Sequence, residues 1–215
     1  GITPSWTVLI HCVGMTRDDI MDAEKDFISG VIWCPSTNLY LLGKTIDMRL
    51  YEFDPDINVN AMGIGSDSRL TADGDLLDEI RAAHPLMACV DPQMGDDRLR
   101  FILFMGNAFY TGIEELYGYL KLGAPADWIV LPQDKDILDV RRADLALVVR
   151  GGVPQIGNPD VMAKFPQIET VRARLDDTEK SINVTLARQI ARCALKEPGL
   201  ELLEDPFARR RWRVF

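Results

Sequence analysis

Three polar side chains that can take part in chemistry, His11, Asn38 and Asp67, each come shortly after an apolar stretch. Imidazoles and carboxylates are the groups that most often transfer protons in enzymes. An acid where a buried strand ends is a common arrangement in α/β enzymes, whose functional groups follow the strands. Asp67 is also followed by a hydroxyl residue, Ser68. The alternative is that Asp67 and Ser68 only accept hydrogen bonds from the backbone of a turn.

The stretches before these side chains predict three β-strands. Thr7 to Ile10 and Val31 to Cys34 are apolar throughout, which is typical of parallel strands covered on both faces. Residues 57–64 form the third strand, which leads to Asp67. Because the carboxyl ends of parallel strands share one rim of a sheet or barrel, His11, Asn38 and Asp67 are expected to lie together.

Helices are predicted between and after these strands. The first extends from a Thr16 cap to about Ile28 and is stopped by Gly30. A loop over 39–43 precedes a helix over 44–53. Asp75 caps another helix, which His84-Pro85 ends, and His84 is expected to be a helix-end residue and not a ligand. Further helical stretches are predicted over 98–109 and 113–119.

The second part of the chain has a different pattern. Short β segments are predicted over 128–131, 145–150 and 153–156, with Gly151-Gly152 in a hairpin turn. Apolar spacing predicts a helix over 179–196, capped by Thr178. The domains are therefore expected to be 1–122 (partial barrel), 123–158 (strands of a small β-sandwich) and 159–215 (a C-terminal helical extension and a basic tail). The tail over 208–213 is expected to be solvated or to dock a subunit.

The composition excludes several kinds of protein. The formal net charge of −9 over 215 residues argues against binding a nucleic-acid backbone, and no apolar run has the length of a membrane span. The sequence shows no signal-peptide pattern, and its four cysteines form no CxxC pair, so a cytoplasmic protein with reduced thiols is expected. With only two histidines, the chain alone cannot build a His-rich metal centre.

Five blocks of sequence in order resemble the later part of the amidohydrolase superfamily, nearest its cytosine deaminase-like and triazine hydrolase-like branch. The blocks are "LIHCVGMTRDDI", "VIWCPSTN", "GIGSDSRLTADGDLLDEIRAA", "LGAPADWIVLP" and "ADLALVVRGG". The resemblance covers about residues 7–155. It implies an α/β fold: strands six to eight of a (β/α)8 barrel, with part of a small β-sandwich.

The resemblance also implies roles for individual residues. Asp67 would touch a divalent metal and shuttle a proton from a metal-activated water, and His11 would be a metal ligand or a group that handles protons or polarises substrate. Zinc is the default metal, with iron, manganese and cobalt as alternatives. Asn38, Trp33 and Ser68 are expected to contribute to binding a small-molecule substrate. The expected reaction is hydrolysis of a C–N bond in a cyclic amide, an imide or an aminated heterocycle.

The sequence lacks the His-x-His pair with which the family begins its metal site. Three strands cannot close a barrel, and an open parallel edge would expose unpaired backbone groups. The expectation is therefore a heteromeric enzyme in which a second polypeptide supplies the N-terminal half of the barrel with its His-x-His pair.

Two other functions are compatible with the sequence. The chain can be a non-catalytic scaffold that completes a partner's barrel, or Gly1-Ile2-Thr3 can be a processed, catalytic N-terminus. Cys12 and Cys34 stand near the predicted rim, where packing is a more frequent role for cysteine than ligation.

Overall fold

The computed structural model describes residues 7–25, 28–52, 62–115 and 117–208. The chain divides into two compact units. The first is Gly1–Ala124 with Ile137–Asp139, and the second is Pro125–Asp136 with Val140–Phe215. The first unit contains all the predicted site residues.

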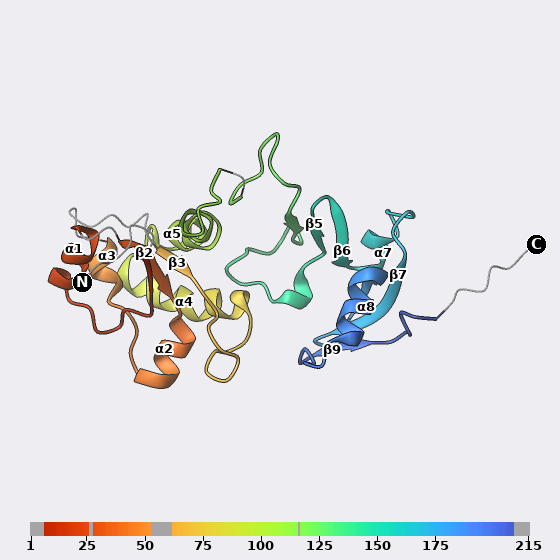
Figure 1. Cartoon of the computed structure of the whole chain (residues 1–215), viewed down its shortest axis with the longest axis horizontal. Helices are drawn as coiled ribbons and strands as arrows, with labels where there is room; N and C mark the ends of the chain where they lie inside the picture. Colours follow the sequence, from red (N-terminus) through yellow and green to blue (C-terminus); the bar gives the residue numbers. More distant parts are fainter. Residues whose placement is uncertain (1–6, 26–27, 53–61, 116, 209–215) are drawn as a thin grey trace, which may run out of the picture. The chain divides into compact units, whose positions relative to one another are not determined.

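A three-stranded parallel sheet forms the centre of the first unit (Figure 1). Its strands are β1 (Thr7–Ile10), β2 (Ile28–Trp33) and β3 (Met62–Ile64), which lie in the order β1-β2-β3. The predicted parallel strands are thereby confirmed, although residues 57–61 of the predicted third strand lie outside the described part. The carboxyl ends of the strands lead to His11, to helix α2 and to Asp67.

Two boundaries around β2 differ from the prediction. Helix α1 spans Arg17–Lys25, and β2 begins at Ile28, so Gly30 lies inside a strand and does not stop the helix. Helix α2 (Pro35–Leu42) occupies part of the predicted loop, and Asn38 is therefore a helical residue. Proline in the first turn and a left-handed Gly43 at the end (φ 65°) provide ordinary start and stop signals for this helix.

Helix α3 (Met48–Glu52) is shorter than predicted, whereas α4 (Leu76–Val90) is longer. The prediction that α4 ends at His84-Pro85 is wrong. An internal proline costs a helix about 3 kcal/mol or more. Continuing past it brings Met87 into the core beside the fully buried Ile80 and Ala83. The Asp75 cap is confirmed, because its carboxylate accepts hydrogen bonds from the backbone of Leu77 and Asp78.

One helical segment covers the outer edge of β3. It comprises α5 (Gly95–Phe101), the π-helical turn η2 (Ile102–Gly106) and α6 (Asn107–Tyr110). The Gly65 N–H donates to Trp33 of β2, so the Ile64 N–H points to the opposite edge of the strand. There it donates to Asn107 Oδ1 at 2.8 Å. The Ile64 N–H is therefore paired at this edge.

Gly106 allows the segment to lie directly against the strand. A Cβ at this position would overlap with the carbonyl oxygen of Met62, so only glycine fits without a shift of the backbone. The stretch after α6 contains turns and no helix among its described residues, which corrects the helix predicted over 113–119.

The second unit is a six-stranded sheet that contains only antiparallel pairs. Its strands are β4 (Trp128–Val130), β5 (Leu147–Arg150), β6 (Val153–Gly157), β7 (Thr170–Leu175), β8 (Thr178–Asn183) and β9 (Leu200–Leu202), in the order β4-β5-β6-β8-β7-β9. The predicted hairpin is present, with both Gly151 (φ 56°) and Gly152 (φ 75°) in left-handed geometry. Helices η3 (Arg142–Asp144), α7 (Pro159–Met162) and α8 (Val184–Arg192) accompany the sheet.

The prediction of a helical extension over 159–215 is wrong where strands β7, β8 and β9 form, and residues 209–215 lie outside the described part. Residues 178–183 form β8, which pairs with both β6 and β7, and helix α8 begins only at Val184. Asp176 and Asp177 both adopt positive φ and make the turn between β7 and β8. Ile182 is completely buried in the core of the second unit, and backbone pairing with both β6 and β7 holds it in a strand.

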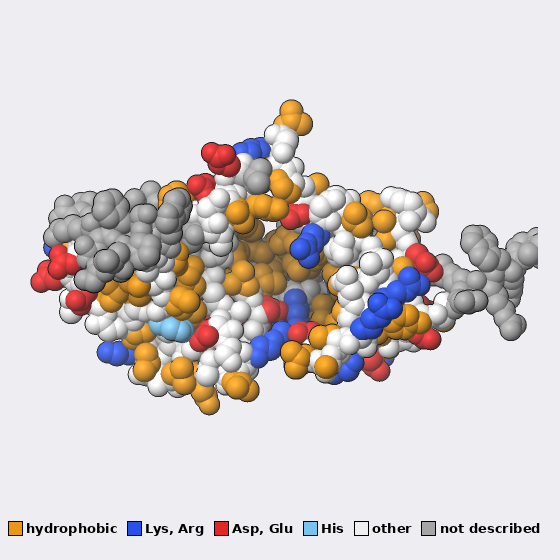
Figure 2. Space-filling model, viewed as in Figure 1, with side chains coloured by type: hydrophobic (Ala, Val, Ile, Leu, Met, Phe, Trp, Pro, Cys, Tyr) orange, Lys and Arg blue, Asp and Glu red, His pale blue; other side chains and the backbone are white. Residues whose placement is uncertain are grey.

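Apolar side chains reach the surface of the first unit, as the orange areas of Figure 2 show. Leu39, Tyr40, Leu41 and Leu42, at the end of α2, are all exposed, and so is Ile10 at the end of β1. Among the described helices, none is both long and apolar enough to cross a membrane.

Candidate functional site

The structure brings His11 and Asp67 together at the carboxyl end of the parallel sheet. His11 Nε2 and Asp67 Oδ2 lie 3.6 Å apart, and the side chains remain 37% and 31% exposed respectively. His11 directly follows β1, and Asp67 comes three residues after the end of β3. The pair is therefore accessible to a small molecule or an ion.

Both residues have strained backbones. His11 has φ 72° and Asp67 has φ 51°, in the left-handed region that side-chain-bearing residues rarely adopt. Cys12, with φ 49°, continues the same turn. Such residues cost about 1–3 kcal/mol each and gather at functional sites, where the surrounding structure holds them.

Asn38 fixes the orientation of the imidazole. Its Oδ1 lies 2.8 Å from His11 Nδ1, and because a carbonyl oxygen can only accept, Nδ1 carries the proton. The Asn38 amide is oriented in turn by Thr45 Oγ1, which accepts from Asn38 Nδ2 at 3.3 Å and from the Trp33 indole N–H at 2.7 Å. This series of hydrogen bonds leaves the lone pair of His11 Nε2 facing Asp67.

A cation is favoured between these two groups. The Nε2 lone pair and the carboxylate oxygen are both acceptors, so their approach to 3.6 Å is stabilised by a proton or a metal ion between them. Two ligands of a tetrahedral zinc ion, bound at the usual 2.0–2.2 Å, lie about 3.4 Å from each other. The contact from Nδ1 to an amide oxygen is also the outer-sphere contact that orients ligating histidines. His11 and Asp67 therefore fit as two ligands of a divalent metal.

The described part of the chain does not complete such a site. It contains no group of three or more His, Cys, Asp or Glu side chains placed to hold a metal ion. A catalytic zinc ion ordinarily has three protein ligands and one open position.

The cysteines near the site are packed as neutral thiols. Cys34 is 1% exposed, and burial, with the charges of Asp67 and Glu79, raises its pKa to about 12. Burial also raises the pKa of Cys12. All four cysteines are free of disulfides.

The other predicted site residues lie in different surroundings. Trp33 is fully buried, and its indole reaches the site through Thr45 and Asn38. Ser68 is exposed, and its Oγ accepts from the Leu70 N–H while its carbonyl accepts from Thr71 and Ala72, so it caps a turn. Asn38 is 1% exposed and contacts His11 instead of an open cavity.

Sequence reasoning missed two groups that support the site. Thr45 orients Asn38, and Glu79 binds Ser36 at the start of α2. Neither carries a local signal, because an isolated threonine after a lysine and an acid on a helix are ordinary surface residues by pattern. Only the packing of distant segments brings them to the site.

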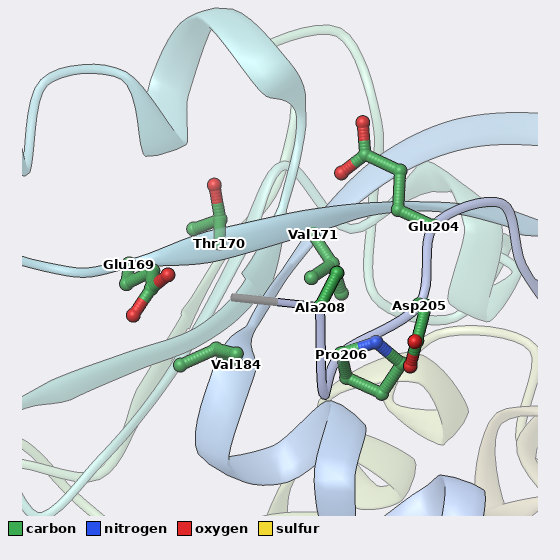
Figure 3. A pocket seen from close by; sticks show the side chains of 8 residues that line it. All are labelled: Glu169, Thr170, Val171, Val184, Glu204, Asp205, Pro206 and Ala208. Atoms are coloured by element: carbon green, nitrogen blue, oxygen red, sulfur yellow. The ribbon is translucent and has the colours of Figure 1, made fainter. Parts of the chain in front are cut away.

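A cavity of about 270 Å³ lies within the second unit (Figure 3). Its walls are Glu169, Thr170, Val171, Val184, Glu204, Asp205, Pro206 and Ala208. Two of its acids already bind backbone groups: Glu204 accepts from the Arg172 N–H and Asp205 from the Phe207 N–H. No predicted site residue lines this cavity.

Solved structures with a similar fold are hydrolases and deaminases. An adenosine deaminase from Xanthomonas campestris with bound zinc matches with a TM-score of 0.56 and 21% identity, over 69% of this chain and 36% of that one. A triazine hydrolase variant matches with a TM-score of 0.57 and 21% identity, over 74% and 40% of the two chains. The guanine deaminase of E. coli matches with a TM-score of 0.57 and 17% identity, over 72% and 40%.

The chain thus spans 36–40% of the length of these structures. No protein-family model matches it, and no curated protein sequence does. At these identities the comparisons show the fold alone.

Proposed function

We propose that this chain is the C-terminal part of a metal-dependent amidohydrolase, containing strands six to eight of its barrel, that hydrolyses a C–N bond in a small molecule. The observation that carries the proposal is the facing pair His11 and Asp67, with the imidazole tautomer fixed by Asn38. The similar folds of two deaminases and a triazine hydrolase support the reaction class. The substrate class is a cyclic amide, an imide or an aminated heterocycle.

The residues of this chain have distinct tasks in the proposed reaction. His11 Nε2 and Asp67 Oδ2 hold the ion, for which zinc is the first choice because a similar structure contains it. When bound there, a divalent ion would supply Lewis acidity and would lower the pKa of a water molecule to about 7. Asp67 accepts the proton of the attacking water and passes it to the leaving nitrogen. Asn38 keeps the proton of His11 on Nδ1.

The remaining ligands and strands come, in this proposal, from a second polypeptide that carries a His-x-His pair. One observation supports it: the described residues offer two ligands, His11 and Asp67, and no group of three. Ile10, 58% exposed at the end of β1, and the exposed apolar end of α2 give the missing part an apolar surface to cover.

The test is a reconstitution. The purified chain is mixed with the polypeptide that co-purifies with it, and ammonia release from a panel of aminated heterocycles is measured with added zinc and after chelation. Metal-dependent turnover by the mixture, and none by either component, supports the proposal. If the chain is monodisperse and equally active alone, no second polypeptide is needed. If every metal-loaded mixture is inactive, the proposed hydrolase activity is contradicted.

A scaffold that only completes a partner's barrel is the second candidate. The solvent-accessible and strained His11 and Asp67 argue against it, since a scaffold has no need to retain strain at these positions. Activity of the reconstituted enzyme that is unaffected by Asp67→Asn would favour the scaffold.

A further inference from the structure

A buried carboxylate, that of Glu79, connects helix α2, which carries Asn38, to the loop that carries Asp67. Glu79 lies on α4 and is fully buried, although acids are rarely found without solvent contact unless they are paired. Both its oxygens accept hydrogen bonds from a single residue: Oε2 from the Ser36 backbone N–H at 3.0 Å, and Oε1 from the Ser36 hydroxyl. A pattern in which both oxygens accept is that of an ionised carboxylate.

Ser36 contacts both Glu79 and the loop that follows Asp67. It lies in the first turn of α2, two positions before Asn38, so its backbone bond to Glu79 fixes the start of the helix that carries Asn38. Its hydroxyl oxygen also accepts from the Asp73 N–H at 3.0 Å, in the loop that follows Asp67.

A second link runs beside the first. Thr37 Oγ1 and Thr71 Oγ1 are hydrogen-bonded at 3.1 Å, which joins the same helix to the same loop. With these bonds, the helix that orients His11 and the loop that carries Asp67 have one common anchor in Glu79. Burial favours the neutral form of Glu79 and raises its pKa, while the bonds from Ser36 oppose this shift.

We propose that Glu79 is a positioning residue that sets the separation of His11 and Asp67 by holding Ser36, in the first turn of α2, beside the loop after β3. It touches neither reacting group and acts through Ser36 and Asn38. This inference rests on the proposed function for its catalytic meaning, but its structural content can be tested without any activity. If Glu79 only stabilised α4, its replacement would leave the His11 tautomer unchanged.

The test uses the two histidines as separate reporters. The side-chain ¹⁵N resonances of the metal-free full-length chain are recorded at one fixed pH at which imidazoles are neutral. In the wild type His11 gives the Nδ1–H tautomer. Glu79→Gln removes the charge at constant shape, and Ser36→Ala removes only the hydroxyl. Both variants are expected to give a mixture of the two His11 tautomers, while His84, on the same helix as Glu79, keeps its wild-type spectrum.

The control is Asp78→Ala, next to Glu79 on α4. Asp78 accepts from the Asp75 N–H in the helix cap, so its loss weakens α4 without touching Ser36. Wild-type signals from both histidines are expected in this variant. Unchanged His11 signals in Glu79→Gln and Ser36→Ala would overturn the proposal, and so would equal changes at His11 and His84, which would report a general loosening of α4.

In the reconstituted hydrolase, Glu79→Gln is expected to lower kcat about 10-fold, as for other residues that orient a ligand from behind, with KM within about twofold of the wild type. A raised KM at constant kcat would overturn the positioning role. If no mixture shows hydrolysis, the proposed function fails, while the tautomer measurement still decides whether Glu79 positions His11.

Discussion

His11 and Asn38 stand 27 positions apart in the sequence and meet through a 2.8 Å hydrogen bond between an imidazole nitrogen and an amide oxygen. This contact determines which imidazole nitrogen faces Asp67. It also explains why an amide is almost completely buried at the start of α2, where its other end is held by Thr45.

Replacement of Asn38 is expected to release the imidazole. In Asn38→Leu the acceptor for Nδ1–H is lost, and zinc binding to the chain, followed through the His11 NMR signals, should weaken about 10-fold. Asn38→Asp keeps an oxygen in place and serves as the control, with binding at least as tight as in the wild type. Equal affinities of the leucine variant and the wild type would show that Asn38 does not orient the ligand.

Replacement of Asp67 tests the proton transfer. Asp67→Asn should lower kcat of the reconstituted enzyme by about 10²–10⁴, the usual contribution of a general acid–base group. Asparagine tolerates the left-handed conformation at φ 51°, so the circular dichroism spectrum and the melting temperature should remain close to those of the wild type. Turnover within twofold of the wild type would contradict the role of Asp67.

Alkylation should distinguish the four cysteines. Cys89 and Cys193 are exposed and should react readily with iodoacetamide at about pH 8, whereas Cys34, buried and with its pKa raised to about 12, should remain unmodified in the folded chain. Cys12 should react at an intermediate rate, because partial burial raises its pKa. Peptide mapping by mass spectrometry measures each site. Early labelling of Cys34 would show that it is reachable and ionised.

Gly106→Ala should destabilise the first unit. The added methyl group meets the carbonyl of Met62, which is backbone and cannot move aside cheaply, so a cost of about 1–3 kcal/mol is expected. Denaturant unfolding followed by tryptophan fluorescence measures it. Gly14→Ala is the matched control, since nothing lies within 4 Å of its Cβ position. Equal stabilities of the two variants would show that η2 does not press on β3.

The effect of Glu79 on stability should depend on pH. Burial, helped by the charges of Asp73 and Asp78, raises the pKa of Glu79 above its ordinary value of 4.5. A raised pKa of an acid means that its contribution to stability is fully present below pH 4.5 and is lost as the pH rises through the folded-state value. The stability of the wild type relative to Glu79→Gln should therefore fall over this window and then level off. Urea unfolding at a series of pH values measures the difference, and an increase with pH would contradict the direction of the shift.

The rim of the first unit could be predicted from sequence because apolar strands and the polar residues that end them form a local pattern. The sequence also indicated that His11, Asn38 and Asp67 share a rim, since parallel strands leave no other arrangement. The start of α2 was missed because Pro35 both closes a strand and opens a helix, and the two possibilities look alike in the sequence.

The remaining errors arise from long-range contacts. Ile182, Leu186 and Ile190 repeat every four residues and imitate one helix, but pairing with β6 and β7 holds the first of them in a strand. The supporting roles of Thr45 and Glu79 depend on segments that meet only in the folded chain, 7 and 43 positions from the residues they bind. No local pattern contains that information.

The bond from Ile64 to Asn107 has a consequence for how the sheet can grow. An amide proton makes one strong hydrogen bond, and this one is already committed to a side chain of the chain itself. A strand that pairs with β3 at this edge must therefore displace α6. The rate of that displacement is limited by how often α6 detaches from β3.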